Sequence, residues 1–128
     1  MKVEELMIGD WFYWEINGKK YPTQVCEDTF GLTNETISNF HPIPITNEIL
    51  KKNGFVNSYI DLSLNKDSVY KYNHFYTGNS VIVDMESNKL IVKYDNDIWM
   101  NLPYNRTIYV HELQHVLKHC EIKKEIII

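Results

Sequence analysis

The clearest helical pattern in the chain is Tyr109-Val110-His111-Glu112-Leu113-Gln114-His115-Val116-Leu117-Lys118-His119-Cys120-Glu121. At about 100° of rotation per residue, its apolar side chains fall within an arc of about 120° on one side of a helix. These side chains are Val110, Leu113, Val116, Leu117 and Cys120. The pattern predicts an amphipathic C-terminal helix whose apolar side covers a core built from the strand-rich sequence upstream.

The polar side of this predicted helix carries the string His111-Glu112-Leu113-Gln114-His115, which matches the H-E-x-x-H motif of zinc peptidases. In that motif, two histidines spaced i and i+4 bind one Zn²⁺, and the glutamate acts as general base on the metal-bound water. His111 and His115 are therefore candidate zinc ligands, and Glu112 is the candidate catalytic base.

Such a zinc site needs a third protein ligand, and the sequence does not identify one. His119 follows His111 by two helical turns, which is about 12 Å along a continuous helix and too far for both to share one ion. The chain ends at Ile128, so we expect no later helix to supply the ligand. His41 and His74 are the upstream candidates, although no spacing rule supports either. We interpret the polar side as a solvated face and expect no cofactor, with zinc as the alternative.

Composition and charge are those of a globular domain. The chain has 128 residues, of which 44% are hydrophobic and 23% charged, so we expect one domain over residues 1–128. The formal net charge of −4 is unfavourable for nucleic-acid binding, because phosphate contacts usually need a basic face. The start of the chain is acidic, with Glu4 and Glu5, and no segment is long and apolar enough for a membrane span. We expect a cytoplasmic protein in which Cys26 and Cys120 are free thiols.

The N-terminal part predicts a β-hairpin. Trp11 to Ile16 is rich in aromatic residues, and Asn17-Gly18 suits a type I′ turn, which needs positive φ at both central positions. The return strand, Lys19 to Val25, contains Pro22, which cannot donate to a ladder and so predicts an edge strand. A Gly-Asp entry followed by a twisted hairpin is similar to the opening of small SH3-like barrels, a likeness of fold alone.

A proline-rich segment, His41-Pro42-Ile43-Pro44-Ile45, follows the hairpin region and must be extended. We interpret it as a stiff connector between a possible N-terminal β lobe, residues 1–45, and an α+β lobe, residues 46–128. Thr46 then predicts the N-cap of a short central helix, and Asn53-Gly54 predicts its end.

The segment from Val56 to Tyr109 predicts strand after strand, including Ser58–Leu64, Val69–Thr77, Val81–Met85 and Leu90–Tyr94. With the two helices, this gives an α+β fold: an antiparallel β-meander with an N-terminal hairpin, one short central helix and one C-terminal amphipathic helix. Alternation places Tyr70, Tyr72, His74 and Tyr76 on one sheet face. The three tyrosines are a candidate binding surface, either for stacked bases or for a protein, although ordinary sheet packing explains the same pattern.

The last residues, Glu121 to Ile128, end in three isoleucines. A free apolar tail is unfavourable in water, so we expect these side chains to be covered, either in an edge strand or against a second copy of the chain. The tail therefore predicts a possible homo-oligomer.

Three segments together resemble a family of small uncharacterised proteins encoded by prophages and mobile elements of Bacteroides-type bacteria. They are Glu5-Leu6-Met7-Ile8-Gly9-Asp10, the central Pro42-Ile43-Pro44-Ile45-Thr46-Asn47-Glu48-Ile49-Leu50 with Asn53-Gly54-Phe55, and Tyr109-Val110-His111-Glu112-Leu113-Gln114-His115. In this family pattern, Gln often stands at the position of Glu112 and Asn at that of His115. The resemblance implies that the zinc motif is incidental, that the setting is the cytoplasm of the host cell, and that no activity is established.

Three functions are consistent with these observations. The first is a non-catalytic accessory protein of a mobile element that binds an unknown protein partner. The second is a minimal zinc-dependent hydrolase or peptidase that uses His111, Glu112 and His115. The third is a single-stranded nucleic-acid binder that uses the tyrosine row, which the net charge of −4 disfavours.

Overall fold

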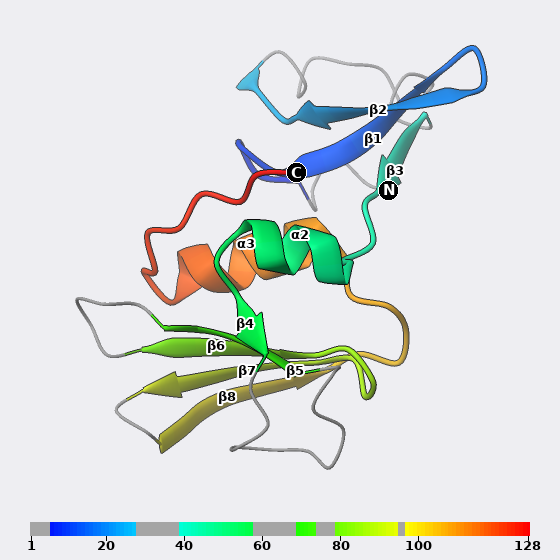
Figure 1. Ribbon diagram of the computed structural model, residues 1–128. Coiled ribbons are helices and arrows are strands. Elements are labelled where there is room, and N and C mark those ends of the chain that lie inside the picture. The colour runs from blue at the N-terminus through cyan, green and yellow to red at the C-terminus, as the bar shows by residue number, and fades with distance from the viewer. Residues whose placement is uncertain (1–5, 28–38, 58–68, 74–78, 95–96) are drawn as a thin grey trace.

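A computed structural model of the protein describes residues 6–27, 39–57, 69–73, 79–94 and 97–128. The described chain forms three layers (Figure 1): a three-stranded sheet, a middle layer that contains both helices, and a five-stranded sheet. Both sheets are antiparallel. The predicted α+β class is therefore confirmed.

The three-stranded sheet contains the predicted hairpin. Its strands are β1 (Trp11–Ile16), β2 (Lys19–Gln24) and β3 (Phe40–Pro42), in the order β2-β1-β3. Asn17 and Gly18 join the first two strands with φ angles of 52° and 78°, as a type I′ turn requires. Pro22 lies in the edge strand β2, as its missing N–H predicted. The likeness to an SH3-like barrel is not confirmed, because these three strands form an open sheet with β1 in the centre.

The five-stranded sheet is the predicted meander, with strands in sequence order. It consists of β4 (Val56–Asn57), β5 (Val69–Asn73), β6 (Ser80–Asp84), β7 (Lys89–Tyr94) and β8 (Asp97–Pro103). The central strand β6 is buried along its whole length. Because side chains alternate along a strand, Val81 and Val83 pack in the main core, while Ile82 joins a smaller cluster with Val69 and Ile91. The predicted strand Ser58–Leu64 and the end of Val69–Thr77 lie outside the described residues.

The two helices are α2 (Asn47–Lys52) and α3 (Val110–His119). Thr46 caps α2 as predicted, because its hydroxyl oxygen accepts a hydrogen bond of 3.2 Å from the Ile49 N–H. The predicted apolar stripe of α3 is confirmed, since Val110, Leu113, Val116, Leu117 and Cys120 are all buried in the main core. Neither helix in these ranges is long and apolar enough to cross a membrane.

The proline-rich segment, predicted as a stiff connector, runs from β3 to α2 and is packed in the core. Its beginning belongs to β3, which pairs with β1, and Ile43 and Ile45 are both buried in the main core. The Ile45 N–H donates to the Ile108 carbonyl over 2.9 Å, and Pro44 forms an antiparallel bridge with Tyr109. The prolines leave the isoleucine side chains free to pack while the chain stays extended. The segment is therefore part of the core next to the start of α3.

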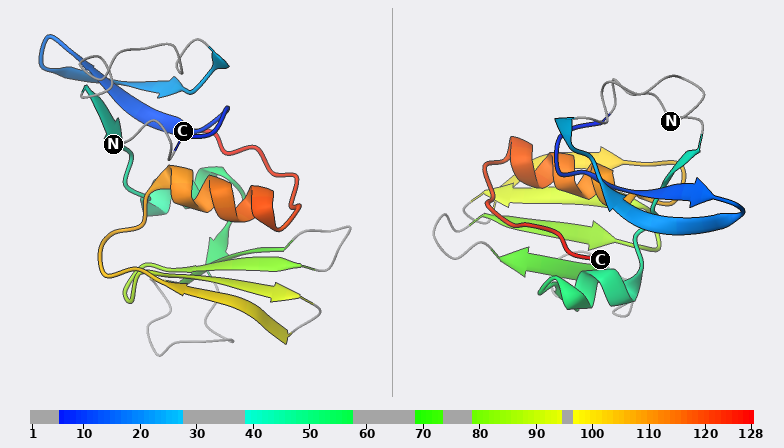
Figure 2. Two further views of the ribbon diagram at one scale, coloured as in Figure 1. Left: turned by 180° about the vertical axis from the view of Figure 1, so that it is seen from behind. Right: turned by 90° about the horizontal axis from the view of Figure 1, so that it is seen from above.

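The C-terminal tail packs against its own chain, between the N-terminal sheet and α2 (Figure 2). Ile122 and Ile126 are buried in the main core, and the Trp11 indole N–H donates to the Ile126 carbonyl over 2.7 Å. Ile127 is bonded to the Asn53 side chain, whose NH2 group donates to the Ile127 carbonyl and whose oxygen accepts from the Ile127 N–H, each over 2.7 Å. The tail forms no edge strand, so that prediction is wrong. Self-association stays a prediction, with the exposed Ile127 side chain available to it.

Candidate functional site

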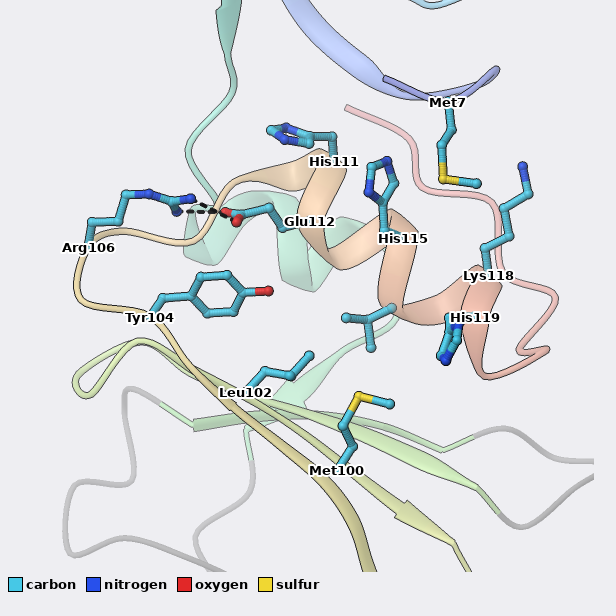
Figure 3. Close-up of a pocket in the computed structure, with 11 residues that line it drawn as sticks. Met7, Met100, Leu102, Tyr104, Arg106, His111, Glu112, His115, Lys118 and His119 are labelled. Carbon is cyan, nitrogen blue, oxygen red and sulfur yellow. Dashed lines mark hydrogen bonds and ion pairs between the residues drawn. The ribbon is translucent and has the colours of Figure 1, made fainter. Parts of the chain in front are cut away.

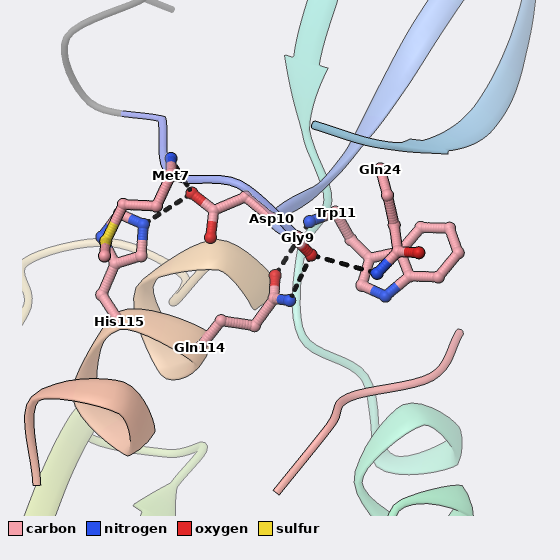
Figure 4. A network of polar contacts seen from close by, with 7 residues as sticks. All are labelled: Met7, Gly9, Asp10, Trp11, Gln24, Gln114 and His115. Carbon is pink, nitrogen blue, oxygen red and sulfur yellow. Dashed lines mark hydrogen bonds and ion pairs between the residues drawn. The ribbon is translucent and has the colours of Figure 1, made fainter. Parts of the chain in front are cut away.

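The polar side of α3 is solvated only at its C-terminal end, where Lys118 and His119 are exposed, so the interpretation of the whole side as a solvated face is wrong for its first turns. His111 is only 8% exposed, and His115 is half-buried. The segment that leads into β1 lies over this side of the helix (Figure 4). Helical periodicity distinguishes two sides of a helix, but it does not show that a second sheet from the start of the chain covers the polar one.

The side chains of Gln114 and His115 bond α3 to the residues at the start of β1 (Figure 4). The Gln114 side chain accepts a hydrogen bond of 2.8 Å from the Trp11 N–H and donates one of 2.9 Å to the Gly9 carbonyl. The His115 Nε2 lies 2.6 Å from the Asp10 Oδ2, which also accepts from the Met7 N–H over 2.8 Å. Asp10 is buried, so this contact takes place in a region sheltered from water. The sequence analysis identified His115 as a ligand candidate and assigned no role to Gln114 or Asp10.

Glu112 is held on both carboxylate oxygens. Its Oε1 and Oε2 accept hydrogen bonds of 2.8 and 2.9 Å from the Arg106 guanidinium (Figure 3). The Tyr109 N–H also donates to Oε1 over 2.9 Å, so Glu112 satisfies a backbone group at the start of α3. Arg106 also lies 4.5 Å from the centre of the Tyr109 ring, which places the guanidinium over an aromatic face.

These contacts set the ionisation of Glu112. Burial raises the pKa of the carboxyl, but the hydrogen bonds from Arg106 and from the Tyr109 N–H, together with the charges of Arg106 and His111, outweigh it. The net result is a pKa below the ordinary value. On the other side of the pair, the hydrogen bond to Glu112 raises the pKa of Arg106. A carboxylate held ionised in this way is a weak general base, because an efficient base has a pKa near the working pH.

One ring nitrogen of His115, Nε2, is already bound to Asp10. Histidines that bind metals often have a carboxylate on one ring nitrogen in this way, which leaves only the His115 Nδ1 for an ion. The His111 ring stacks on Tyr109 and meets the His115 ring edge to face, with ring centres 5.6 Å apart. Across the described ranges, no cluster of three or more His, Cys, Asp or Glu side chains is placed to hold a metal ion.

Of the two proposed upstream ligands, the structure describes only His41, which has another partner. His41 lies in β3, where its Nε2 is 2.7 Å from the Glu15 Oε2 on the neighbouring strand β1. His74 lies outside the described residues.

The tyrosine row contributes to the core. Tyr70 is only 2% exposed and belongs to the main core. Tyr72 is half-buried, and its ring lies 5.4 Å from that of Phe55, with the Lys124 ammonium 5.7 Å from its centre. Tyr76 lies outside the described residues. The described members therefore act as packing residues of the sheet, the ordinary explanation of their spacing.

A groove of about 770 Å³ lies between α3 and the edge strand β8 (Figure 3). Met100 and Leu102 project from β8 toward the helix, and Tyr104 continues the same alternation beyond the strand. The full lining consists of Met7, Met100, Leu102, Tyr104, Arg106, His111, Glu112, His115, Val116, Lys118 and His119. The groove therefore combines an apolar floor with a polar wall made by the motif side of α3.

The polar wall of the groove carries two cations and one acid. Glu112 compensates the charge of Arg106, which leaves Lys118 as the cation of the wall without an acid beside it in the groove, together with three histidines. Lys118 and His119 are exposed at the C-terminal end of α3. Burial, and then the nearby Glu112 charge, raise the pKa of Tyr104, so its phenol keeps its proton and can donate a hydrogen bond at neutral pH. The sequence contained these residues, but only the approach of β8 to α3 brings them together.

Comparison of the chain with protein-family models, with curated protein sequences and with solved structures gave no significant match.

Proposed function

We propose that the protein is a non-catalytic protein-binding module and that its binding site is the groove between α3 and β8. The supporting observation is a division of roles among neighbouring side chains. Glu112, Gln114 and His115 are engaged in contacts within the chain, whereas the rest of the groove that Glu112 and His115 border presents an apolar floor and the cation Lys118. The first group stabilises the fold, and the groove offers a surface to a partner.

Catalysis by the motif would require these internal contacts to break. Glu112 would have to leave the Arg106 guanidinium, which bonds both of its carboxylate oxygens, before it could act on a metal-bound water. Hydrogen bonds to charged groups contribute about 1.5–3 kcal/mol each to stability. An active geometry would therefore be several kcal/mol less stable than the one observed.

The composition of the groove favours a protein partner. Met7 and Met100 are long and unbranched, and methionine adapts its shape to different apolar side chains. Tyr104 combines a large apolar ring with a hydroxyl group, a combination that is enriched in protein interfaces. Lys118, a cation of the groove wall with no acid beside it there, complements an acidic residue on the partner. We expect the partner to insert apolar side chains and to place acidic residues near Lys118 and His119.

The sequence resemblance supports a biological setting for this module. The segments Glu5–Asp10, Pro42–Phe55 and Tyr109–His115 resemble small prophage and mobile-element proteins of Bacteroides-type bacteria. On that basis we propose an accessory protein of a mobile element that acts in the cytoplasm of its host cell.

A photocrosslinking experiment tests the binding surface. A benzoylphenylalanine placed at His119, which is exposed at the groove, should give a discrete protein adduct in host cells. The same group at Val56, which is 60% exposed on the opposite edge strand of that sheet, should not. The added substitution Lys118→Glu should remove the adduct at position 119, because it reverses a charge at the groove. Equal adducts from both positions, or an adduct insensitive to Lys118→Glu, would contradict the proposed surface.

A further inference from the structure

We propose that the groove accepts an extended acidic peptide segment of the partner protein, which adds to the edge of β8 as a further strand of the sheet. This inference rests on the proposed function and specifies the shape and chemistry of the occupant. Three observations carry it: the position of β8 in its sheet, the spacing of the side chains beneath α3, and the charge of the groove wall.

The first observation is the edge position of β8. Among the described strands, the order is β4-β5-β6-β7-β8, so β8 pairs with β7 on one side only. It covers Asp97–Pro103, whereas the strand at the other edge, β4, covers only Val56–Asn57. An edge strand presents a row of backbone N–H and carbonyl groups that can pair with an added strand. Of the two edges, β8 is the one long enough to pair with several peptide residues.

The second observation is the match between this edge and the helix above it. The side chains of Met100, Leu102 and Tyr104 all face the groove. From the first to the last of them the extended chain covers about 13 Å, at about 3.3 Å per residue. Glu112 and His119 also line the groove, and at about 1.5 Å per residue this part of α3 spans about 10 Å. An extended peptide beside β8 would therefore place two or three alternate side chains beneath α3. Strand addition of this kind draws affinity from the backbone and specificity from those side chains.

The third observation is the direction of charge along the groove. Lys118 and His119 lie at the end of α3 near Met100, while the compensated pair of Arg106 and Glu112 lies at the other end (Figure 3). Lys118, the cation of the groove wall that has no acid beside it in the groove, is thus at the Met100 end. An acidic residue of the peptide would face Lys118 there, and its alternate apolar side chains would contact Met100 and Leu102.

The test starts from a random nonapeptide library displayed on phage and selected against the full chain. The inference predicts enriched peptides with apolar residues at alternate positions and Asp or Glu at one end. Fluorescence anisotropy then measures a selected peptide. Lys118→Glu should weaken its binding at least about tenfold, and Val56→Lys on the opposite sheet edge should leave it unchanged.

Backbone pairing is tested separately with the same peptide. In an extended peptide, every second backbone N–H faces β8 and the others face away from it. Methylation of the nitrogens that face β8 should weaken binding at least about tenfold, because it removes the N–H groups that would pair with the strand. Hydrogen exchange of the backbone amides of residues 97–102 should slow when the unmodified peptide is bound.

The outcomes separate this inference from the proposed function. If binding responds to Lys118→Glu but not to backbone methylation, and exchange in β8 does not slow, strand addition is wrong while the groove remains the binding site. If no peptide is enriched, or if the enriched peptides are insensitive to Lys118→Glu, the inference is overturned. The proposed function then depends only on the position-specific crosslink from residue 119.

Discussion

Replacing Gln114 by alanine should destabilise the protein, because this side chain joins α3 to the entry of β1. In the structure it accepts from the Trp11 N–H over 2.8 Å and donates to the Gly9 carbonyl over 2.9 Å. After truncation, the Gly9 carbonyl keeps a second donor, the Gln24 amide at 3.1 Å. The Trp11 N–H loses the side-chain oxygen that it bonds. The main loss is therefore one partly buried donor.

The magnitude follows from that difference. A buried donor left without its partner costs about 1–3 kcal/mol. For a chain of this size, each kcal/mol lowers the midpoint of thermal unfolding by about 3–5 °C, so Gln114→Ala should lower it by about 3–15 °C. Gln24→Ala is the matched control, because Gln24 is exposed and bonds the same carbonyl. It should change the stability by less than about 0.5 kcal/mol.

Chemical denaturation followed by circular dichroism measures both variants against the parent. If Gln114→Ala is as stable as the parent, or if Gln24→Ala is destabilised as much, the Gln114 contacts do not hold α3 and the N-terminal sheet together. The contacts of α3 with the N-terminal sheet would then not depend on Gln114.

Three further predictions concern other parts of the structure. The pKa of Glu112 is lower in the folded chain than its ordinary value. Ionised Glu112 therefore contributes fully to the free energy of unfolding above its unfolded-state pKa of about 4.3, and this contribution is lost as the pH falls through its folded-state pKa. Glu112→Gln should therefore reduce the loss of stability between neutral pH and about pH 3, and an unchanged pH profile would refute the role of its bonds to Arg106. Burial raises the pKa of the Cys120 thiol, so a disulfide reagent at pH 8 should label exposed Cys26 quickly and Cys120 only on unfolding. In the Cys26→Ser variant only Cys120 remains, and fast labelling of that folded variant would contradict the prediction. Asn53→Ala should free the C-terminal tail and speed its digestion by carboxypeptidase, and unchanged digestion would show that the amide does not hold it.

Local sequence patterns predicted the elements that depend on neighbouring residues. Asn17-Gly18 predicted the hairpin because few other residue pairs adopt two successive positive φ angles. Thr46 predicted the start of α2 because its hydroxyl can replace a backbone partner within one helical turn. The apolar stripe of α3 followed from helical spacing.

The candidate site could not be predicted in the same way, because its contacts join distant parts of the chain. Trp11 and Gln114 are separated by 103 positions, and Asp10 and His115 by 105. Nothing in the sequence near Gly9 indicates that it meets a polar helix side. The H-E-x-x-H spacing was visible, but its chemical meaning depends on what each side chain contacts, and Glu112 contacts Arg106. The groove likewise exists only because β8 approaches α3.

Zinc content of the untagged protein, purified without chelators, tests most directly whether the motif residues are structural and the protein non-catalytic. The account predicts only trace zinc in the parent, since the His115 Nε2 contacts Asp10 and Glu112 contacts Arg106. One tightly held zinc per chain, lost in His115→Ala but retained in Glu112→Gln, would contradict it and favour the zinc-hydrolase alternative.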